Sequence, residues 1–153
     1  EYRGYDSAGI ALMHNGAIKS MKKAGKVSEL NKKINDSPLQ GSIGISHTRW
    51  ATHGEPNDTN AHPHKDQTGK IFLIHNGIIE NYSTLKEVLI RKGFSFKSET
   101  DTEVLVNLIS DIYYSDGLNF EQDVHEALMP VVGTYGIVAS FLLELVKLVA
   151  ARQ

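Results

Sequence analysis

Residues 47–54 read HTRWATHG, and the first of them is the last residue of a predicted buried strand, residues 42–47. Arg49 lies where this strand opens into a loop, and its planar guanidinium can hold a carboxylate through two parallel hydrogen bonds. The next residues add an aromatic ring and polar groups: Trp50, Thr52 and His53. The stretch therefore indicates a site for an amino-acid carboxylate. An ordinary strand-to-loop junction, with the tryptophan covering the core, is the alternative.

A second chemically distinctive stretch follows a long loop. Periodicity disappears over residues 51–69, and ordered loops of that length are often functional. An apolar strand is then predicted over residues 70–75, ending at Asn76 and Gly77. The Asn76 amide and the Gly77 N–H can together bind a developing oxyanion, and glycine lets the backbone approach a ligand closely. A plain turn is the alternative for the same two residues.

Two further stretches place charged residues where they can bind a ligand. Within residues 98–103 (SETDTE), Thr100-Asp101-Thr102-Glu103 fits a capping box ahead of a predicted helix, and Asp101 can pair with a substrate ammonium. The alternative is simple cap and dipole stabilisation, which contributes about 1 kcal/mol. Residues 1–9 (EYRGYDSAG) place Arg3 where it can fix an anion or orient a chain terminus. A surface turn with a structural salt bridge is the alternative there.

The order of predicted elements favours the α+β class. Asn15-Gly16 between two extended runs is a strong hairpin signal. Further strands are expected over residues 8–14, 17–22, 94–97 and 133–140, and helices over residues 27–34 (capped by Ser28), 104–112 and 121–129, with one more that carries Leu85, Val88 and Leu89 on one face and ends at Gly93. Hairpin-linked strands beside grouped helices favour α+β over a simple βαβ alternation. Residues 140–146 contain no turn-forming residue and fit either a strand connection or a helix.

Composition excludes several classes of function. The 153 residues suffice for one domain with a core, and a net charge of -2 provides no basic field for nucleic acid. The longest apolar stretch, residues 141–150, contains Glu144 and Lys147 and is too short to span a bilayer. The absence of cysteine excludes disulfides, thiolate metal sites and a cysteine nucleophile within these residues. We expect a cytoplasmic domain that binds neither nucleic acid nor membrane.

Histidines raise one rival hypothesis, a metal-binding domain. Five of them cluster in the sequence: His47, His53, His62, His64 and His75. Zinc sites commonly use helix-spaced pairs or mixed cysteine and carboxylate ligands at fixed spacings, and no such signature is present. We therefore predict no metal ligands and interpret His62 and His64 as structural loop residues.

Taken in order, five stretches resemble the glutaminase domain of the glutamine–fructose-6-phosphate aminotransferases (isomerising), also called glucosamine-6-phosphate synthases. They are residues 1–9 (EYRGYDSAG), 47–56 (HTRWATHGEP), 60–64 (NAHPH), 75–81 (HNGIIEN) and 98–104 (SETDTEV). Residues 50–56 followed by 60–64 are typical of the hexosamine branch of the class II glutamine amidotransferases. The resemblance implies a four-layer αββα sandwich of the N-terminal-nucleophile hydrolase type.

The resemblance also implies a reaction, the hydrolysis of L-glutamine to glutamate and ammonia. An N-terminal cysteine would attack the side-chain amide, with its own α-amine as the base and with no metal or other cofactor. Arg49 would hold the α-carboxylate of glutamine, and Asp101 its α-ammonium. The oxyanion hole would be formed by Asn76 and Gly77. The loop that closes over glutamine would contain Trp50, Thr52 and His53. Arg3 would be the arginine that helps to position the end of the chain that carries the nucleophile.

The sequence departs from the family pattern at both ends. The cysteine with the strand and helix that follow it, the later strands and the sugar isomerase domain are all missing from residues 1–153, although residues 147–152 resemble the next family strand. We therefore expect a partial glutaminase domain that is inactive by itself. In the complete family enzyme, ammonia passes to fructose 6-phosphate on the isomerase domain, through which the family suggests a homodimer. A glutamine-binding module without chemistry is the second hypothesis.

Overall fold

The computed structural model describes residues 5–116, 119–142 and 147–153, which form two antiparallel sheets and four helices. The first sheet has the strand order β2-β1-β3 and the second has the order β4-β5-β6-β7. The strands are β1 (Ser7–His14), β2 (Ala17–Ala24), β3 (Ile43–Arg49), β4 (His64–Lys65), β5 (Ile71–Ile79), β6 (Gly133–Phe141) and β7 (Lys147–Arg152). The helices are α1 (Val27–Asp36), α2 (Tyr82–Arg91), α3 (Asp101–Asp116) and α4 (Phe120–Leu128).

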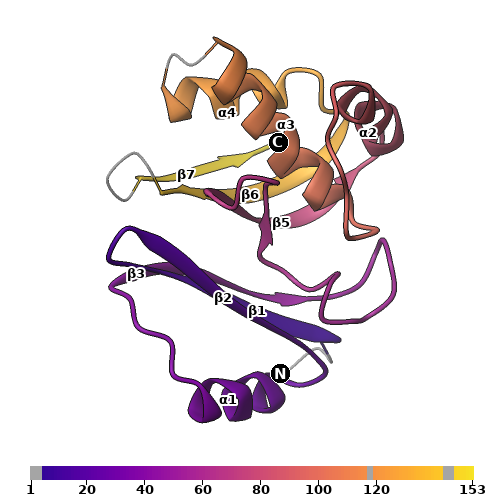
Figure 1. Ribbon diagram of the computed structural model, residues 1–153. Helices are drawn as coiled ribbons and strands as arrows, with labels where there is room; N and C mark the ends of the chain where they lie inside the picture. Colours follow the sequence, from indigo (N-terminus) through magenta and orange to yellow (C-terminus); the bar gives the residue numbers. More distant parts are fainter. Residues whose placement is uncertain (1–4, 117–118, 143–146) are drawn as a thin grey trace.

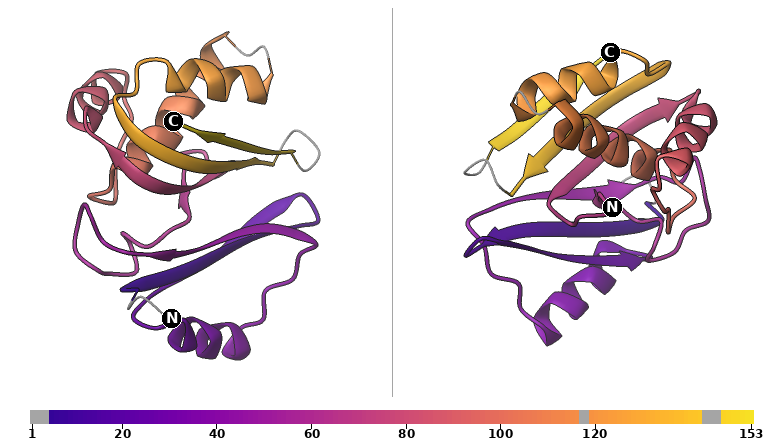
Figure 2. Two further views of the ribbon diagram at one scale, coloured as in Figure 1. Left: turned by 180° about the vertical axis from the view of Figure 1, so that it is seen from behind. Right: turned by 45° about the horizontal axis from the view of Figure 1, so that its top comes forward.

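The two sheets face each other between two helical layers (Figure 1). Helix α1 covers the outer face of the first sheet, while α2, α3 and α4 lie over the outer face of the second (Figures 1 and 2). A small apolar cluster, built on Ala11, Ile45 and Phe72, joins the inner faces of the sheets. The order of layers is therefore α-β-β-α, which confirms the predicted α+β sandwich.

The first sheet is organised around the hairpin of β1 and β2. Asn15 and Gly16 have φ of 49° and 71°, the left-handed conformation that a two-residue hairpin turn requires, so the predicted turn is confirmed. Strand β1 also pairs with β3, with Ser7 opposite Arg49. This register brings the residues just before β1 to the end of β3, where the HTRWATHG stretch leaves the sheet.

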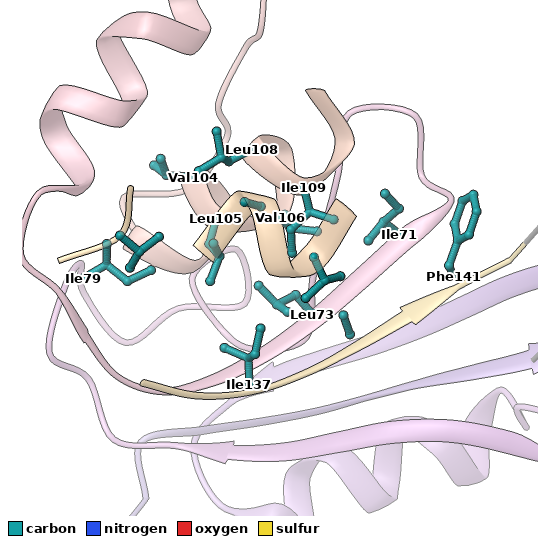
Figure 3. Close-up of a cluster of buried hydrophobic side chains, with 14 of the residues drawn as sticks. Ile71, Leu73, Ile79, Val104, Leu105, Val106, Leu108, Ile109, Ile137 and Phe141 are labelled. Atoms are coloured by element: carbon teal, nitrogen blue, oxygen red, sulfur yellow. The ribbon is translucent and has the colours of Figure 1, made fainter. Parts of the chain in front are cut away.

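The main hydrophobic core lies between the second sheet and its helices (Figure 3). Ile71 and Leu73 of β5 are fully buried against α3. Helix α3 is buried on nearly all sides over residues 101–110, with Val104, Leu105, Val106, Leu108 and Ile109 in the core, because it packs on β5 and also lies between α2 and α4. Its first turn is thereby fixed beside the end of β5.

Strand β5 is longer than the sequence predicted. It does not end at residue 75 but continues to Ile79, and β6 pairs with it over the whole length. Asn76 and Gly77 lie opposite Gly136 and Tyr135 and form no turn, because a complete antiparallel partner carries the strand past them. The oxyanion candidates therefore belong to a sheet, which is a more rigid support than a turn.

Other local predictions were wrong for similar reasons. No strand forms over residues 94–97; instead the carboxylate of Glu103 accepts the backbone N–H groups of Lys97 and Ser98. Ser28 is not the cap of α1, which follows Lys26 without a side-chain cap. Half of the predicted capping box exists, since Thr100 Oγ1 accepts the N–H of Glu103.

The predictions around the second sheet were closer. Helices α3 and α4 match the predicted helices to within a few residues, and β7 occupies residues 147–152 as expected. Strand β4 lies in the loop that was predicted to lack regular structure. The prediction for residues 140–146 falls largely on residues 143–146, which lie outside the described part of the chain.

Candidate functional site

A cavity of about 380 Å³ lies where β3, β5, the start of α3 and the loop after β3 meet. The residues predicted from sequence to bind or activate a substrate all line it, apart from Arg3: Arg49, Trp50, Thr52, His53, Asn76, Gly77 and Asp101. Arg3 lies outside the described residues. Three segments that are distant in sequence are thus brought to one cavity, and this juxtaposition depends on the packing of the two sheets.

Arg49 is the buried cation of the cavity, with only 3% of its surface exposed. Its Nη2 donates to the backbone carbonyl oxygens of His53 and Gly54, which ties the loop after β3 back onto the strand. Its Nη1 lies 3.8 Å from a carboxylate oxygen of Asp6 and has no hydrogen-bond acceptor among the described residues. Burial lowers the pKa of Arg49, and Asp6 and Asp101 oppose that effect. One nitrogen of a guanidinium that stays charged is therefore buried at the cavity wall without a hydrogen-bond acceptor in the described part of the chain.

Asp101 is the buried anion of the cavity and the first residue of α3. One oxygen, Oδ2, accepts the N–H of Ile79 at 2.9 Å and lies 3.8 Å from Nδ1 of His75 and 4.0 Å from Nδ1 of His53. The other oxygen, Oδ1, is 3.4 Å from the hydroxyl of Thr102. The helix N-terminus favours a negative charge here, so the carboxylate can attract a ligand ammonium.

Gly77 of β5 has no room for a side chain. Its φ is 134°, and a Cβ placed there would lie 2.0 Å from the carbonyl oxygen of Thr134 on β6. Asn76 beside it is exposed at the cavity, and its Oδ1 is 2.9 Å from Nε2 of His47 on β3. One wall of the cavity therefore contains the bare backbone of Gly77 next to the side-chain carboxamide of Asn76.

The loop after β3 forms the rim. Trp50 is 63% exposed, so the alternative in which it covers the core is wrong. Thr52 and His53 also line the cavity, and the ring of His53 meets that of Tyr82 edge-on at 5.0 Å. The rim is therefore a polar segment that carries one large, mostly exposed aromatic side chain, Trp50.

Three histidines are bonded to hydroxyl groups at the start of α3. Nε2 of His62 and Nδ1 of His75 lie 2.9 and 3.1 Å from the Thr102 hydroxyl, and Nε2 of His64 lies 3.1 Å from that of Thr100. Burial lowers the pKa of all three rings. His62 lies in the loop, His64 in β4 and His75 in β5, so their neutral rings hold three segments against the start of α3. The hydrogen bonds agree with a structural role for His62 and His64, but His64 belongs to a strand and not, as predicted, to the loop. The part of the chain that the structure describes contains no group of three side chains that could hold a metal ion.

Sequence reasoning missed some residues of the site. Asp6 accepts the N–H of Ala51 and faces Arg49, so it supports both the cation and the start of the loop. It belongs to the distinctive stretch of residues 1–9 but had no assigned role, because its contact with Arg49 depends on the pairing of β1 with β3. His47 and Thr102 stood inside the distinctive stretches without an assigned role, and Tyr5 also lines the cavity.

The chain belongs to the glutamine amidotransferase domain family, whose model matches residues 30–118. A curated relative, glutamine–fructose-6-phosphate aminotransferase (isomerizing) of Pyrococcus horikoshii, is 53% identical over 153 residues, which are all of this chain and 25% of that protein. The enzyme of the same name from Thermus thermophilus is 53% identical over 140 residues, covering 92% of this chain and 23% of that protein. The chain thus spans about a quarter of the length of the curated relatives it matches.

Solved structures agree with this assignment. Glutamine phosphoribosylpyrophosphate amidotransferase from B. subtilis superposes with a TM-score of 0.80 at 26% identity, covering 99% of this chain and 32% of that one. An allosteric regulatory enzyme of purine biosynthesis superposes with a TM-score of 0.76 at 28% identity, covering 90% of this chain and 30% of that one. Both the family resemblance and the fold of the amidotransferases are therefore confirmed. In addition, none of the described helices has the length and apolar character needed to cross a membrane.

Proposed function

We propose that residues 1–153 form part of the glutaminase half of a glutamine–fructose-6-phosphate aminotransferase, which releases ammonia from L-glutamine. The observation that carries the proposal is the meeting of Arg49, Asp101 and the Asn76–Gly77 pair at one cavity. A buried cation and a buried anion at the same cavity suit the two charged groups of an α-amino acid. The 53% identity to aminotransferases of that name supports the assignment to this branch.

The binding mode follows from the free hydrogen-bonding groups. The α-carboxylate of glutamine accepts a hydrogen bond from Nη1 of Arg49, the guanidinium nitrogen with no hydrogen-bond acceptor among the described residues. The α-ammonium pairs with the carboxylate of Asp101. The side-chain amide then extends to Asn76 and Gly77 on β5, and Trp50, Thr52 and His53 enclose the ligand from the rim.

Hydrolysis needs a nucleophile, and the chain contains no cysteine. We propose that a thiol with a free α-amine, from a segment outside these 153 residues, attacks the carbon of the side-chain amide. The α-amine, whose reference pKa is about 7.7–8.0, takes the thiol proton and passes it to the leaving nitrogen. Asn76 Nδ2 and the Gly77 N–H stabilise the negative oxygen of the tetrahedral intermediate. Ammonia departs, a thioester remains, and water then releases glutamate.

The rest of the proposed enzyme lies outside this chain. The relatives are about four times as long as the stretch they share with these residues. We propose that the additional length supplies the sugar isomerase domain, which uses the ammonia to aminate fructose 6-phosphate, and the interface of a homodimer.

The binding step can be tested on the chain itself by titrating ¹⁵N-labelled protein with three ligands. They are L-glutamine, glutaramate, which lacks the α-amine, and 4-aminobutanamide, which lacks the α-carboxylate. Because a charged hydrogen bond contributes about 1.5–3 kcal/mol, each analogue should bind about 10- to 100-fold more weakly than glutamine. Glutamine should shift the amide resonances of Arg49, Gly77 and Asp101.

Two outcomes would count against the proposal. Equal affinity for the three ligands would show that Arg49 and Asp101 do not recognise the α-carboxylate and the α-ammonium of glutamine. Shifts confined to residues away from the cavity would place the ligand elsewhere. In the full-length protein, glutamine binding without release of glutamate would favour the second hypothesis, a binding module without chemistry.

A further inference from the structure

One hydrogen bond crosses from the first sheet to the second at the cavity wall. Nε2 of His47, on β3, lies 2.9 Å from Oδ1 of Asn76, on β5. The imidazole also packs against His62, with the ring centroids 4.6 Å apart. A contact between the sheets therefore ends on the carboxamide that the proposed function assigns to the oxyanion hole.

The orientation of the Asn76 carboxamide decides whether it can stabilise a negatively charged oxygen. A carboxamide has an oxygen that only accepts hydrogen bonds and a nitrogen that only donates them. A negative oxygen in the cavity can be stabilised only by the nitrogen end. In the structure the oxygen faces His47, and Nδ2 has no hydrogen-bond partner among the described residues. The nitrogen end is therefore the one left for a ligand.

The ring state of His47 selects this orientation. Burial lowers the pKa of His47 and so does Arg49, which together outweigh the opposite effect of Asn76; the ring is therefore neutral near pH 7 and carries one N–H. Nδ1 is buried without a hydrogen-bond partner in the described structure, and buried N–H groups without an acceptor are rare. The proton consequently belongs on Nε2, where it is donated to Oδ1 of Asn76. A proton on Nδ1 would turn Nε2 into an acceptor and reverse the amide.

We propose that His47 is a positioning residue, whose Nε2–H holds Oδ1 of Asn76 and so presents the Nδ2 end to the side-chain carbonyl of glutamine. The proposal rests on the proposed function, because it assigns Asn76 to the ligand amide. It adds a residue that acts on the ligand through its neighbour, Asn76.

The tautomer can be read directly in the ¹⁵N-labelled chain. Long-range ¹H–¹⁵N correlation spectra at pH 7.5 distinguish a protonated Nε2 from a protonated Nδ1 in each histidine. We expect Nε2–H for His47. A protonated Nδ1 would overturn the proposal, whatever the chain binds.

Matched variants test the consequence for binding. The amide nitrogen of glutamine at position 47 can occupy the place of Nε2, whereas that of asparagine reaches only the place of Nδ1. His47→Gln should therefore keep the affinity for L-glutamine within about threefold, while His47→Asn and His47→Leu should each lose about tenfold, the size of one hydrogen bond. L-Norvaline, which carries a methyl group in place of the carboxamide, should bind all four proteins equally.

The two ligands separate positioning from a merely structural role. Equal losses for L-glutamine and L-norvaline, or a His47→Gln variant as weak as His47→Leu, would contradict positioning. If the unaltered chain does not bind L-glutamine, the proposed function fails instead, and the tautomer of His47 then decides the orientation of Asn76 by itself.

Discussion

Asp101 Oδ2 accepts the backbone N–H of Ile79 at 2.9 Å, so the first residue of α3 is bonded to the last residue of β5. This bond joins the two elements that carry the proposed ammonium site and the proposed oxyanion hole. The same carboxylate therefore has a structural function and a proposed binding function, and a suitable pair of variants can separate them.

The separation uses Asp101→Asn and Asp101→Ala. Asparagine keeps an oxygen for the Ile79 N–H but removes the charge, so stability should change little while L-glutamine affinity falls at least about tenfold. Alanine leaves a buried N–H unpaired and should in addition lower the free energy of unfolding by about 1–3 kcal/mol. Urea unfolding and calorimetric titration measure the two effects. Unchanged affinity in the asparagine variant would refute the role of the charge.

Gly77→Ala should destabilise the domain far more than an alanine at another left-handed glycine. The new Cβ would lie 2.0 Å from the Thr134 carbonyl oxygen, so β5 and β6 must shift apart. Gly69 is the matched control, because its φ is 72° and a Cβ added there would have no neighbour within 4 Å. We expect a loss of about 3 kcal/mol or more at Gly77 and about 1 kcal/mol at Gly69 in urea unfolding. Similar losses would mean that β6 yields easily.

Asn60 anchors the loop that carries the rim of the cavity. It is 1% exposed, and its amide bonds Glu55 O, Glu99 Oε2 and Glu99 N at 3.0–3.1 Å. Asn60→Ala should cost about 2–3 kcal/mol, because a buried amide loses three hydrogen bonds, one of them to a carboxylate. Asn31→Ala, on the exposed face of α1, should stay within about 0.5 kcal/mol. A thermal shift for Asn60→Ala no larger than that of the control would show that the loop is held elsewhere.

The buried histidines predict that stability decreases in mild acid. Burial lowers the pKa of His62 and His64 in the folded chain, whereas in the unfolded chain they titrate near 6.5. As the pH falls below about 6.5, only the unfolded state takes up these protons. Each histidine should then reduce the free energy of unfolding by about 1.4 kcal/mol per pH unit.

Urea unfolding between pH 7.5 and pH 5.5 measures this slope. His64→Gln should flatten it by about one proton, since the glutamine cannot be protonated, whereas His14→Gln in the exposed first hairpin should leave it unchanged. A slope near zero for the unaltered chain would contradict the neutral histidine network.

Local signals in the sequence were sufficient where neighbours in the chain determine the structure. The Asn15-Gly16 hairpin and helices α3 and α4 depend on turn chemistry and on apolar periodicity, and all were predicted. The family motifs also identified the residues that meet at the cavity. Such motifs carry information on tertiary arrangement that periodicity alone does not contain.

Two of the failures have tertiary causes. The extension of β5 past Gly77 depends on β6, more than fifty residues away in the chain. Asp6 becomes a neighbour of Arg49 only through the pairing of β1 with β3. The failure at residues 94–97 is local: no strand forms there, and the side chain of Glu103, six residues further on, accepts the N–H of Lys97.

The most direct test of the central claim is a crystal structure of this chain with L-glutamine, which it cannot hydrolyse through a thiol of its own. The α-carboxylate should lie within about 3 Å of Nη1 of Arg49, the α-ammonium at Asp101 and the side-chain carbonyl at Asn76 and Gly77. Glutamine bound in the reverse direction, or outside this cavity, would contradict the proposed binding mode.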